Sequence, residues 1–349
     1  MPWGPRTHGA THGIPGVFQK AHIQERARLG FAPFQILILP PLPRAQRRAT
    51  LGAMIDKLEM FIALANERHF GRAAEAVGVT QPSLSGAIRQ LEDQLGVQLV
   101  YRGSRFQGLT PEGQRVLDWA RRIVGDMRAL KDEMRSVHAG LSGNLRIGVI
   151  PTALPMVAEL TGPFTARHPN MRVTILSRTS VEILDGIESL ELDAGITYLD
   201  NEPLGRVFQT PLYTEFYRCL CAPGTEFAGR DRISWHELAS VPLCLLTSDM
   251  QNRRIVNQHL AEAGAKVQAM VESNSTIALV SHVRSGLWAS VVPMKLAEMF
   301  TGQGLVAIPI VDPEAEHLVG LITTRRDPQT PVLQALIEEA ARLATRLRR

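Results

Sequence analysis

The stretch Thr80–Leu95, TQPSLSGAIRQLEDQL, decides how the rest of this 349-residue chain is interpreted. Thr80 is placed to cap a helix, because a threonine oxygen accepts hydrogen bonds from first-turn N–H groups that otherwise lack a partner. Four apolar residues then recur at spacings of four, three and four, which predicts one inward-facing side of a helix. That side consists of Leu84, Ile88, Leu91 and Leu95.

The first turn and the outer face of the same helix carry short or forked polar side chains. Such side chains can reach base edges and phosphates in a DNA major groove. The residues expected to contact DNA are Thr80, Gln81, Pro82, Ser83, Ser85 and Arg89. An ordinary amphipathic surface helix would show the same pattern, so the flanking segments must decide between the two readings.

Two shorter helices are predicted before this stretch, over Ile55–Asn66 and Gly71–Val77, and Gly78 supplies a turn between the second helix and the cap. A short helix, a glycine-containing turn and a capped helix form a helix-turn-helix arrangement. The flanking sequence therefore favours the DNA-reading interpretation.

Beyond the helix, Gln98–Tyr101 and Arg105–Leu109 predict two short strands of a hairpin wing. Arg102 and Arg105 lie at the predicted tip, where basic side chains suit phosphate contact. A hairpin with a purely structural role is the alternative.

A long helix is predicted from Thr110, a cap that is followed by a first-turn proline, Pro111. Apolar residues along it alternate spacings of four and three, which is the pattern of a seam between two helices. This predicted dimer seam consists of Val116, Ala120, Ile123, Met127, Leu130 and Met134. The alternative is a helix that lies on its own domain.

From Leu145 onward, predicted strands and helices alternate, which argues for a parallel α/β sheet. Ligands bind such sheets where a strand ends and the next helix begins, and free N–H groups there favour a small anion. Small polar residues or a methionine mark the candidate helix starts at Thr152, Thr179, Ser180, Thr247, Met250 and Ser275. Each serine or threonine could instead be only a cap. Arg253 and Arg254 either face the anion or are solvated or ion-paired.

The net charge of +4 is weak evidence for a nucleic-acid partner. Residues 1–53 hold seven basic residues against one glutamate, so the remainder of the chain is slightly acidic. We expect this segment to be a disordered extension, or translation to start at Met54, and an export signal is disfavoured because Pro33 interrupts its apolar run. No apolar run approaches the length of about 20 residues that spans a bilayer.

We expect no catalytic residue, metal site or cofactor. The sequence shows no nucleophile elbow, phosphate-binding glycine loop or metal-ligand spacing. Cys219, Cys221 and Cys244 are expected to be structural and buried rather than redox-active. His282 and His317 are isolated in the sequence and are interpreted as surface or lining residues.

The segment from Ala73–Ala74 through TQPSLS, Leu91–Glu92, Leu95–Gly96 and Leu99 to LTPEG at Leu109–Gly113 resembles the N-terminal signature of LysR-type transcriptional regulators. It departs at Val100, where the family usually has phenylalanine. The resemblance implies a dimerising linker helix and a two-lobed domain like the periplasmic binding proteins, with crossings placed here near Tyr198–Pro203 and Leu305–Ile310. It also implies that Thr152, Ser180, Thr247 and Met250 border an inducer cleft.

A finer resemblance, over IDKLEMFIALANERHFGRAAEA, YRGSRFQG, VIPTALPMVAELT and YLDNEPLGRV, is to the subgroup associated with NAD-dependent formate dehydrogenase operons. It makes formate a candidate effector.

The sequence thus predicts an α+β multidomain protein. Its parts are a winged helix-turn-helix over 54–110, a linker helix over 111–140 and an α/β effector domain over 145–345, with lobe I at 145–200 and 308–345 and lobe II at 203–305. The expected partners are double-stranded DNA, a small-molecule effector, further copies of the chain in a dimer or tetramer and, as a further candidate, RNA polymerase. The expected location is the cytoplasm. The alternatives are a two-lobed solute-binding protein, a ligand sensor without gene control, and an α/β enzyme.

Overall fold

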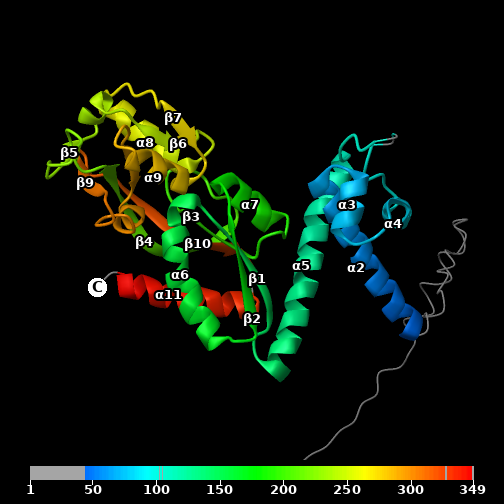
Figure 1. Cartoon of the computed structure of the whole chain (residues 1–349). Coiled ribbons are helices and arrows are strands. Elements are labelled where there is room, and N and C mark those ends of the chain that lie inside the picture. Colours follow the sequence, from blue (N-terminus) through cyan, green and yellow to red (C-terminus); the bar gives the residue numbers. More distant parts are fainter. Residues whose placement is uncertain (1–43, 102, 104, 327, 348–349) are drawn as a thin grey trace, which may run out of the picture. The chain divides into compact units, whose positions relative to one another are not determined.

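The computed structural model describes residues 44–101, 103, 105–326 and 328–347. Its first three helices are α2 (Arg44–Glu67), α3 (Phe70–Ala76) and α4 (Gln81–Leu95) (Figure 1). The predicted helix Ile55–Asn66 lies within α2, which begins before Met54. Residues 1–43 lie outside the described residues, so the expectation of a disordered extension stays a prediction for them.

The three helices enclose a small apolar core that includes Phe61, Leu64 and Leu84. The predicted inward face of α4 is confirmed at Leu84, Ile88 and Leu91, which are 0 to 2% exposed. It is wrong at Leu95, which is 41% exposed. The helix ends at that residue because Gly96 adopts a left-handed conformation (φ 70°) and turns the chain away.

The segment after α4 pairs less than the predicted hairpin. One antiparallel bridge joins Val100 to Leu109, in place of two strands. The Glu92 carboxylate accepts hydrogen bonds from the N–H groups of Leu99 (2.8 Å) and Val100 (3.3 Å). The Leu99 side chain is buried in the core. Backbone hydrogen bonds from Tyr101 N to the Gly108 carbonyl (3.2 Å) and from Thr110 N to the Leu99 carbonyl (3.0 Å) flank the bridge, so pairing is short but present at this end of the wing.

Helix α5 (Pro111–Ala139) follows from Thr110, whose Oγ1 accepts from Gly113 N at 2.9 Å, as its predicted cap role requires. Gly113 is held against the wing so closely that a Cβ atom there would lie 2.0 Å from the Leu99 carbonyl oxygen. Only glycine allows this approach.

Lobe I of the following domain contains a mixed sheet rather than the predicted parallel one. Strands β1 (Gly143–Val149), β2 (Met171–Ser177) and β3 (Ala194–Tyr198) are parallel, and β10 (Glu316–Thr324) pairs antiparallel to β3 and to β4 (Val207–Cys221). The sheet is accompanied by η1 (Pro151–Ala153), α6 (Leu154–Arg167), α7 (Ser180–Glu188) and α11 (Pro331–Leu347).

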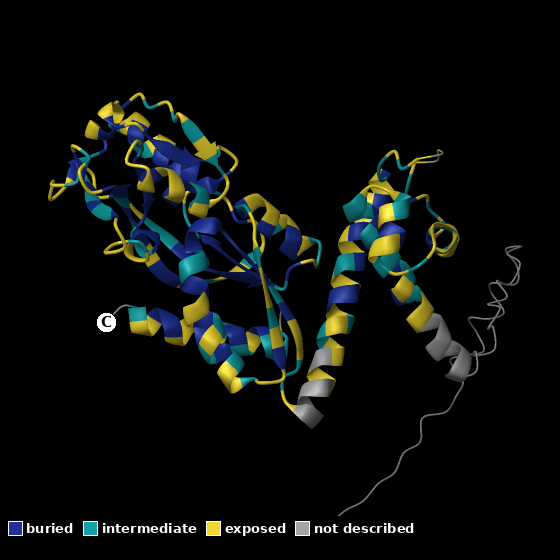
Figure 2. Ribbon diagram, in the orientation of Figure 1, coloured by how far each residue is buried: buried dark blue, intermediate teal, exposed yellow. Residues whose placement is uncertain are grey.

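Lobe II is built on the second half of β4, which pairs with β8 (Ser290–Pro293) and β9 (Val306–Val311). Its remaining elements are β5 (Ile233–Ser234), η2 (Glu237–Ser240), β6 (Cys244–Leu246), α8 (Gln251–Glu262), β7 (Val271–Ser273), α9 (Thr276–Arg284) and α10 (Met294–Glu298). Buried residues line the strands and the inner faces of the helices (Figure 2).

The chain passes between the lobes at two places that lie later than the predicted crossings. Strand β4 runs through the first crossing: it pairs with β10 as far as Phe216 and with β8 from Tyr217. The return path runs between Val311, the end of β9, and Glu316, the start of β10. The first crossing is therefore a strand rather than a loop, and it carries Glu215 and Tyr217 into the region between the lobes.

Candidate functional site

The exposed face of α4 holds most of the residues expected to contact DNA. Gln81, Pro82, Ser83 and Arg89 are exposed, and Ser85 is half-buried. Thr80 Oγ1 accepts from Ser83 N at 3.4 Å and shares a hydrogen bond with Ser83 Oγ at 2.9 Å. The Thr80 side chain therefore serves as the helix cap, and the polar surface begins with Gln81.

Of the two basic residues predicted in the wing, Arg105 is exposed. Arg102 lies outside the described residues, so its role stays a prediction.

The apolar residues of α5 divide into two groups. Leu117, Ala120 and Val124 are 0 to 3% exposed and pack into the core of the helix-turn-helix domain. Ala120 thus faces its own domain and does not belong to an open seam, as the alternative reading of this helix allowed.

The second group of α5 residues forms an apolar stripe at the surface. Three predicted seam residues, Ile123, Leu130 and Met134, are 43 to 52% exposed, whereas Val116 and Met127 are half-buried. Trp119, which was not predicted, is 63% exposed. The sequence could have assigned Trp119 to this stripe, because it lies four residues before Ile123 and residues four apart share a helix face.

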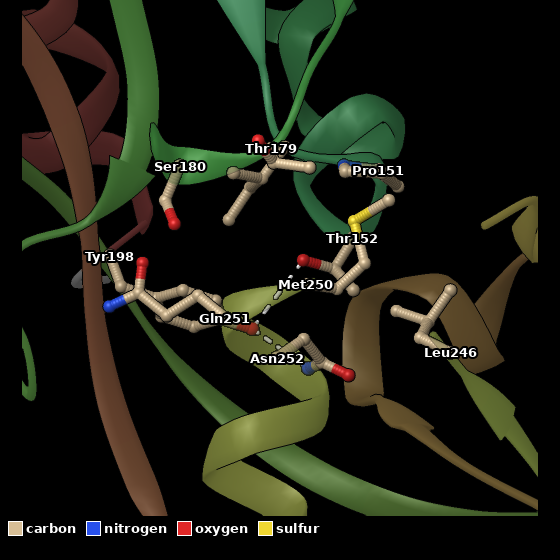
Figure 3. A pocket seen from close by; sticks show the side chains of 10 residues that line it. Pro151, Thr152, Thr179, Ser180, Tyr198, Leu246, Met250, Gln251 and Asn252 are labelled. Carbon is tan, nitrogen blue, oxygen red and sulfur yellow. Dashed lines mark hydrogen bonds between the residues drawn. The ribbon is translucent and has the colours of Figure 1, made fainter. Parts of the chain in front are cut away.

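A pocket between the two lobes brings together several of the predicted effector residues (Figure 3). We call it the cleft pocket. It is lined by Ile150, Pro151, Thr152, Thr179, Ser180, Tyr198, Leu246, Met250, Gln251 and Asn252. Thr152, Thr179, Ser180 and Met250 were predicted, whereas Thr247 and Ser275 do not line the pocket. The Ser275 hydroxyl accepts from Ala278 N at 3.4 Å, so it caps α9.

Two helices begin at the cleft pocket. Thr179 and Glu182 form a capping box at the start of α7, which occupies the Thr179 hydroxyl. The next residue, Ser180, is 3% exposed, and its Oγ has no hydrogen-bond partner among the described residues. At the start of α8, Gln251 Nε2 donates to the Asp200 carbonyl at 3.4 Å, while the buried Oε1 of Gln251 has no partner there either. The pocket therefore presents two buried polar atoms that a ligand could satisfy.

Tyr198 lies at the floor of the cleft pocket and was not predicted as a site residue. Its hydroxyl accepts a hydrogen bond from Asn252 Nδ2 at 2.9 Å, and Thr152 Oγ1 lies 3.4 Å away (Figure 3). The same hydroxyl shares a short hydrogen bond with Glu215 Oε1. Tyr198 ends the buried strand β3, and the end of such a strand was the only sequence signal for it.

Neither candidate arginine lines the pocket. Arg253 donates to Glu272 Oε1 at 2.7 Å and to the Leu246 carbonyl at 2.5 Å. Arg254 makes two hydrogen bonds with Glu202, of 2.7 and 2.9 Å. The ion-paired alternative therefore describes both, and no charged side chain of the described residues lines the pocket.

Behind Tyr198, a group of titratable and aromatic residues occupies the region where β3, β4 and β10 meet α8. We call it the hinge cluster; it consists of Tyr198, Asp200, Glu215, Tyr217, His259 and His317. Burial raises the pKa of Glu215 to about 8, against the lowering effect of the hydrogen bond from Tyr198. His317 is not isolated, as its position in the sequence had suggested: its Nε2 lies 3.0 Å from His259 Nε2.

The three cysteines are buried, and burial raises the pKa of each thiol, to about 11 for Cys244. Among the described residues, no group of three or more histidine, cysteine, aspartate or glutamate side chains is arranged to hold a metal ion. No helix within the described part of the chain is long and apolar enough to cross a membrane.

Together, a helix-turn-helix with an exposed polar helix and a two-lobed domain with a buried interlobe pocket define a ligand-responsive DNA-binding protein. Residues 55–114 match the family of bacterial regulatory helix-turn-helix proteins of lysR type, and residues 138–344 match the LysR substrate binding domain. The chain belongs to the LysR family of DNA-binding transcriptional regulators with an effector-binding domain.

Similar proteins support this assignment. The Escherichia coli K12 DNA-binding transcriptional dual regulator OxyR is 29% identical over 286 residues, covering 81% of this chain and 93% of that protein. The probable hydrogen peroxide-inducible genes activator of Streptomyces viridosporus is 30% identical, covering 82% and 94%.

Solved structures agree on the fold. A full-length OxyR variant from Pseudomonas aeruginosa has a TM-score of 0.66 at 26% identity and covers 82% of this chain and 97% of that one. CbnR bound to its target DNA has a TM-score of 0.55 at 21% identity, covering 83% and 99%, and this likeness concerns the fold alone.

Proposed function

We propose that this regulator reads DNA with the exposed face of α4 and responds to a small anionic metabolite held in the cleft pocket. The observation that carries the proposal is the convergence of two helix starts on a pocket with a buried, unpartnered hydroxyl, Ser180 Oγ, which can donate to an anion. Free N–H groups at helix starts favour negative charge, so an anion can bind where no cationic side chain is present.

The DNA-reading residues we propose are Gln81, Pro82, Ser83, Ser85 and Arg89, with Arg102 and Arg105 contacting phosphates. Arg89 supports this role because it is exposed and has neither a hydrogen bond nor an ion pair with another described residue in the structure. An arginine that is free in this way can fork onto a guanine edge or a phosphate.

The exposed stripe of α5, Trp119, Ile123, Leu130 and Met134, is the proposed dimer contact. Large apolar side chains at helical spacing are costly to leave in water and gain stability when a second copy covers them. A two-fold dimer presents two recognition helices to two half-sites. Tetramer formation and contact with RNA polymerase are further parts of the proposal, as is action in the cytoplasm, where operator DNA is found.

Ligand binding would change DNA binding by favouring one arrangement of the lobes over another. A ligand shifts such an equilibrium only as far as it prefers one arrangement, and the cleft pocket is suited to this because its lining comes from both lobes. The linker helices would carry the difference to the spacing of the recognition helices, with altered DNA bending as the output. Formate is the first effector to test, with control of a formate dehydrogenase operon as the corresponding target.

The names of the relatives suggest a second candidate, a thiol-based peroxide sensor. Peroxide reacts with the thiolate, and reactive cysteines have lowered pKa values and some exposure. All three cysteines here are buried and have raised pKa values. A metabolite sensor is therefore the better supported function.

The proposal is tested by fluorescence anisotropy with the DNA upstream of the gene itself, across a salt series and against random competitor DNA. Specific binding that weakens steeply with salt supports the regulator. Equal, weak binding to both DNAs contradicts operator recognition at that position, and repeating the measurement from Met54 shows whether the N-terminal extension interferes. Calorimetry with formate then tests the effector.

A further inference from the structure

Glu215 is a buried carboxyl group without a counter-cation. It is 1% exposed and lies on β4, two residues before the strand begins to pair with β8 of lobe II. No ion pair joins it to any lysine or arginine of the described residues, and the two arginines of α8, Arg253 and Arg254, are paired with Glu272 and Glu202. An isolated ionised carboxylate in such a place is costly, and the group avoids the cost by taking up a proton.

This inference rests on the proposed effector pocket. We propose that neutral Glu215 makes the Tyr198 hydroxyl a hydrogen-bond donor to the ligand, and that the pocket thereby selects anions although no cationic side chain lines it. Glu215 does not line the pocket. It is therefore a positioning residue that acts through Tyr198.

The hydrogen bonds around Tyr198 explain how one proton changes the pocket. The tyrosine hydroxyl has one donor hydrogen and two acceptor lone pairs. When Glu215 is ionised, Tyr198 must donate to it, and Asn252 and Thr152 fill the two lone pairs. Tyr198 then offers the pocket no donor hydrogen, and a negative charge lies behind it.

When Glu215 is neutral, its own O–H can donate to the Tyr198 oxygen. Asn252 Nδ2 fills the second lone pair, and the tyrosine hydrogen turns toward Thr152 and the pocket. A ligand carboxylate can accept this hydrogen, together with the Ser180 hydroxyl and the free N–H groups at the start of α7 and α8. The neutral form thus suits an anion, and the ionised form repels it.

The other titratable groups around Glu215 do not supply a positive charge directly. Tyr198 comes from β3, Asp200 follows it, and Tyr213 and Tyr217 flank Glu215 on β4. Aspartate and tyrosine side chains are neutral or negative, so none of them offers a cation, and the charge of Asp200 raises the pKa of Glu215 further.

Two histidines complete the surroundings. His317 is the cross-strand partner of Glu215 on β10, but its Nδ1 faces Asp200 Oδ1 at 3.4 Å, and its Nε2 faces His259. Burial and the neighbouring His317 lower the pKa of His259. A charge on His317 would therefore be balanced by Asp200, and Glu215 remains without a partner.

The proposal predicts the sign of the pH dependence. A bound anion raises the pKa of Glu215 further, so binding takes up a proton once the pH exceeds the value of about 8 in the free protein. The affinity for an anion should then fall about tenfold per pH unit above pH 8. A neutral ligand of the same shape should show no such fall.

The test uses the full-length protein with two isosteric pairs, formate against formamide and acetate against acetamide, in calorimetry at pH 7 and pH 9.5. We expect the wild type to prefer the carboxylates at pH 7 and to lose at least about tenfold in their affinity at pH 9.5. Glu215→Gln keeps a neutral group that can donate to Tyr198, so it should retain the preference at both pH values. Glu226→Gln, at an exposed position of lobe II, is the matched control and should behave as the wild type.

Infrared titration gives a ligand-free readout. The wild type should show the carbonyl band of a protonated carboxylic acid that disappears around pH 8 and is absent from Glu215→Gln. The proposal is overturned by a band missing at pH 7, by carboxylates that bind no better than their amides, or by the same pH dependence in Glu215→Gln. Operator binding measured on the same preparations distinguishes failure of this inference from failure of the proposed function. Intact operator binding without a preference for anions contradicts only this inference, whereas absent operator binding contradicts the proposed function.

Discussion

The two polar surfaces of this protein differ in their contact with water. On α4 the polar side chains are exposed, so water satisfies them until DNA replaces it. In the cleft pocket, Ser180 Oγ and Gln251 Oε1 are buried without partners, and Glu215 is buried without a cation. The first surface is available at little cost to folding, whereas the second lowers the stability of the domain in exchange for a prepared ligand site.

This difference predicts that the largest effect on stability comes from Glu215. Its pKa rises from 4.5 to about 8 on folding, so the folded state holds the proton more tightly. The stability that this group contributes is complete below pH 4.5 and is lost as the pH rises to 8. Relative to Glu215→Gln, the free energy of unfolding should fall by up to about 1.4 kcal/mol per pH unit between these values. Urea unfolding of both proteins from pH 5 to 8.5 measures it, and parallel pH profiles would refute a buried proton.

The two faces of α4 should respond in opposite ways to truncation. Ile88 is 2% exposed in the domain core, so Ile88→Ala should destabilise the helix-turn-helix domain by about 3 kcal/mol. Chemical denaturation followed by helical circular dichroism measures the loss. A change below about 1 kcal/mol would mean that the inward face of α4 is assigned wrongly.

The neighbouring residue provides the contrast. Arg89→Ala should change the free energy of unfolding by less than about 0.5 kcal/mol because the side chain is exposed. It should weaken operator binding by about 1 to 3 kcal/mol if the guanidinium contacts a base. Anisotropy titrations on operator and random DNA decide the role: an equal loss on both indicates a phosphate contact, and no loss on either removes Arg89 from the interface.

The same difference explains what could be predicted from the sequence. Helix α4 is determined locally: the Thr80 cap, the apolar spacing and Gly96 lie within seventeen residues, and only Leu95 was placed wrongly, because the helix ends there. The floor of the cleft pocket is assembled from β3, β4 and α8 by strand pairing and lobe packing. Periodicity reveals helix starts such as Ser180, but it cannot show that the tyrosine at the end of β3 meets an asparagine 54 positions later.

The α5 stripe shows an intermediate case. The expected long helix is present as α5, but the residues assigned to one seam fall on two apolar faces. The core of the chain's own domain takes Ala120, while Trp119 remains exposed. Spacing alone does not distinguish a face covered within the chain from a face that a second copy would cover.

The smallest and sharpest test compares two adjacent residues at the start of α7. Thr179 is part of a capping box, so Thr179→Ala should destabilise the effector domain by about 1 kcal/mol. The buried Ser180 hydroxyl has no partner among the described residues, so Ser180→Ala should leave stability unchanged or raise it slightly while lowering the affinity for the effector. Thermal unfolding and calorimetry on both variants measure the two effects. If Ser180→Ala destabilises the domain as much as Thr179→Ala does, the Ser180 hydroxyl has a structural partner in the folded protein and is not available to bind a ligand.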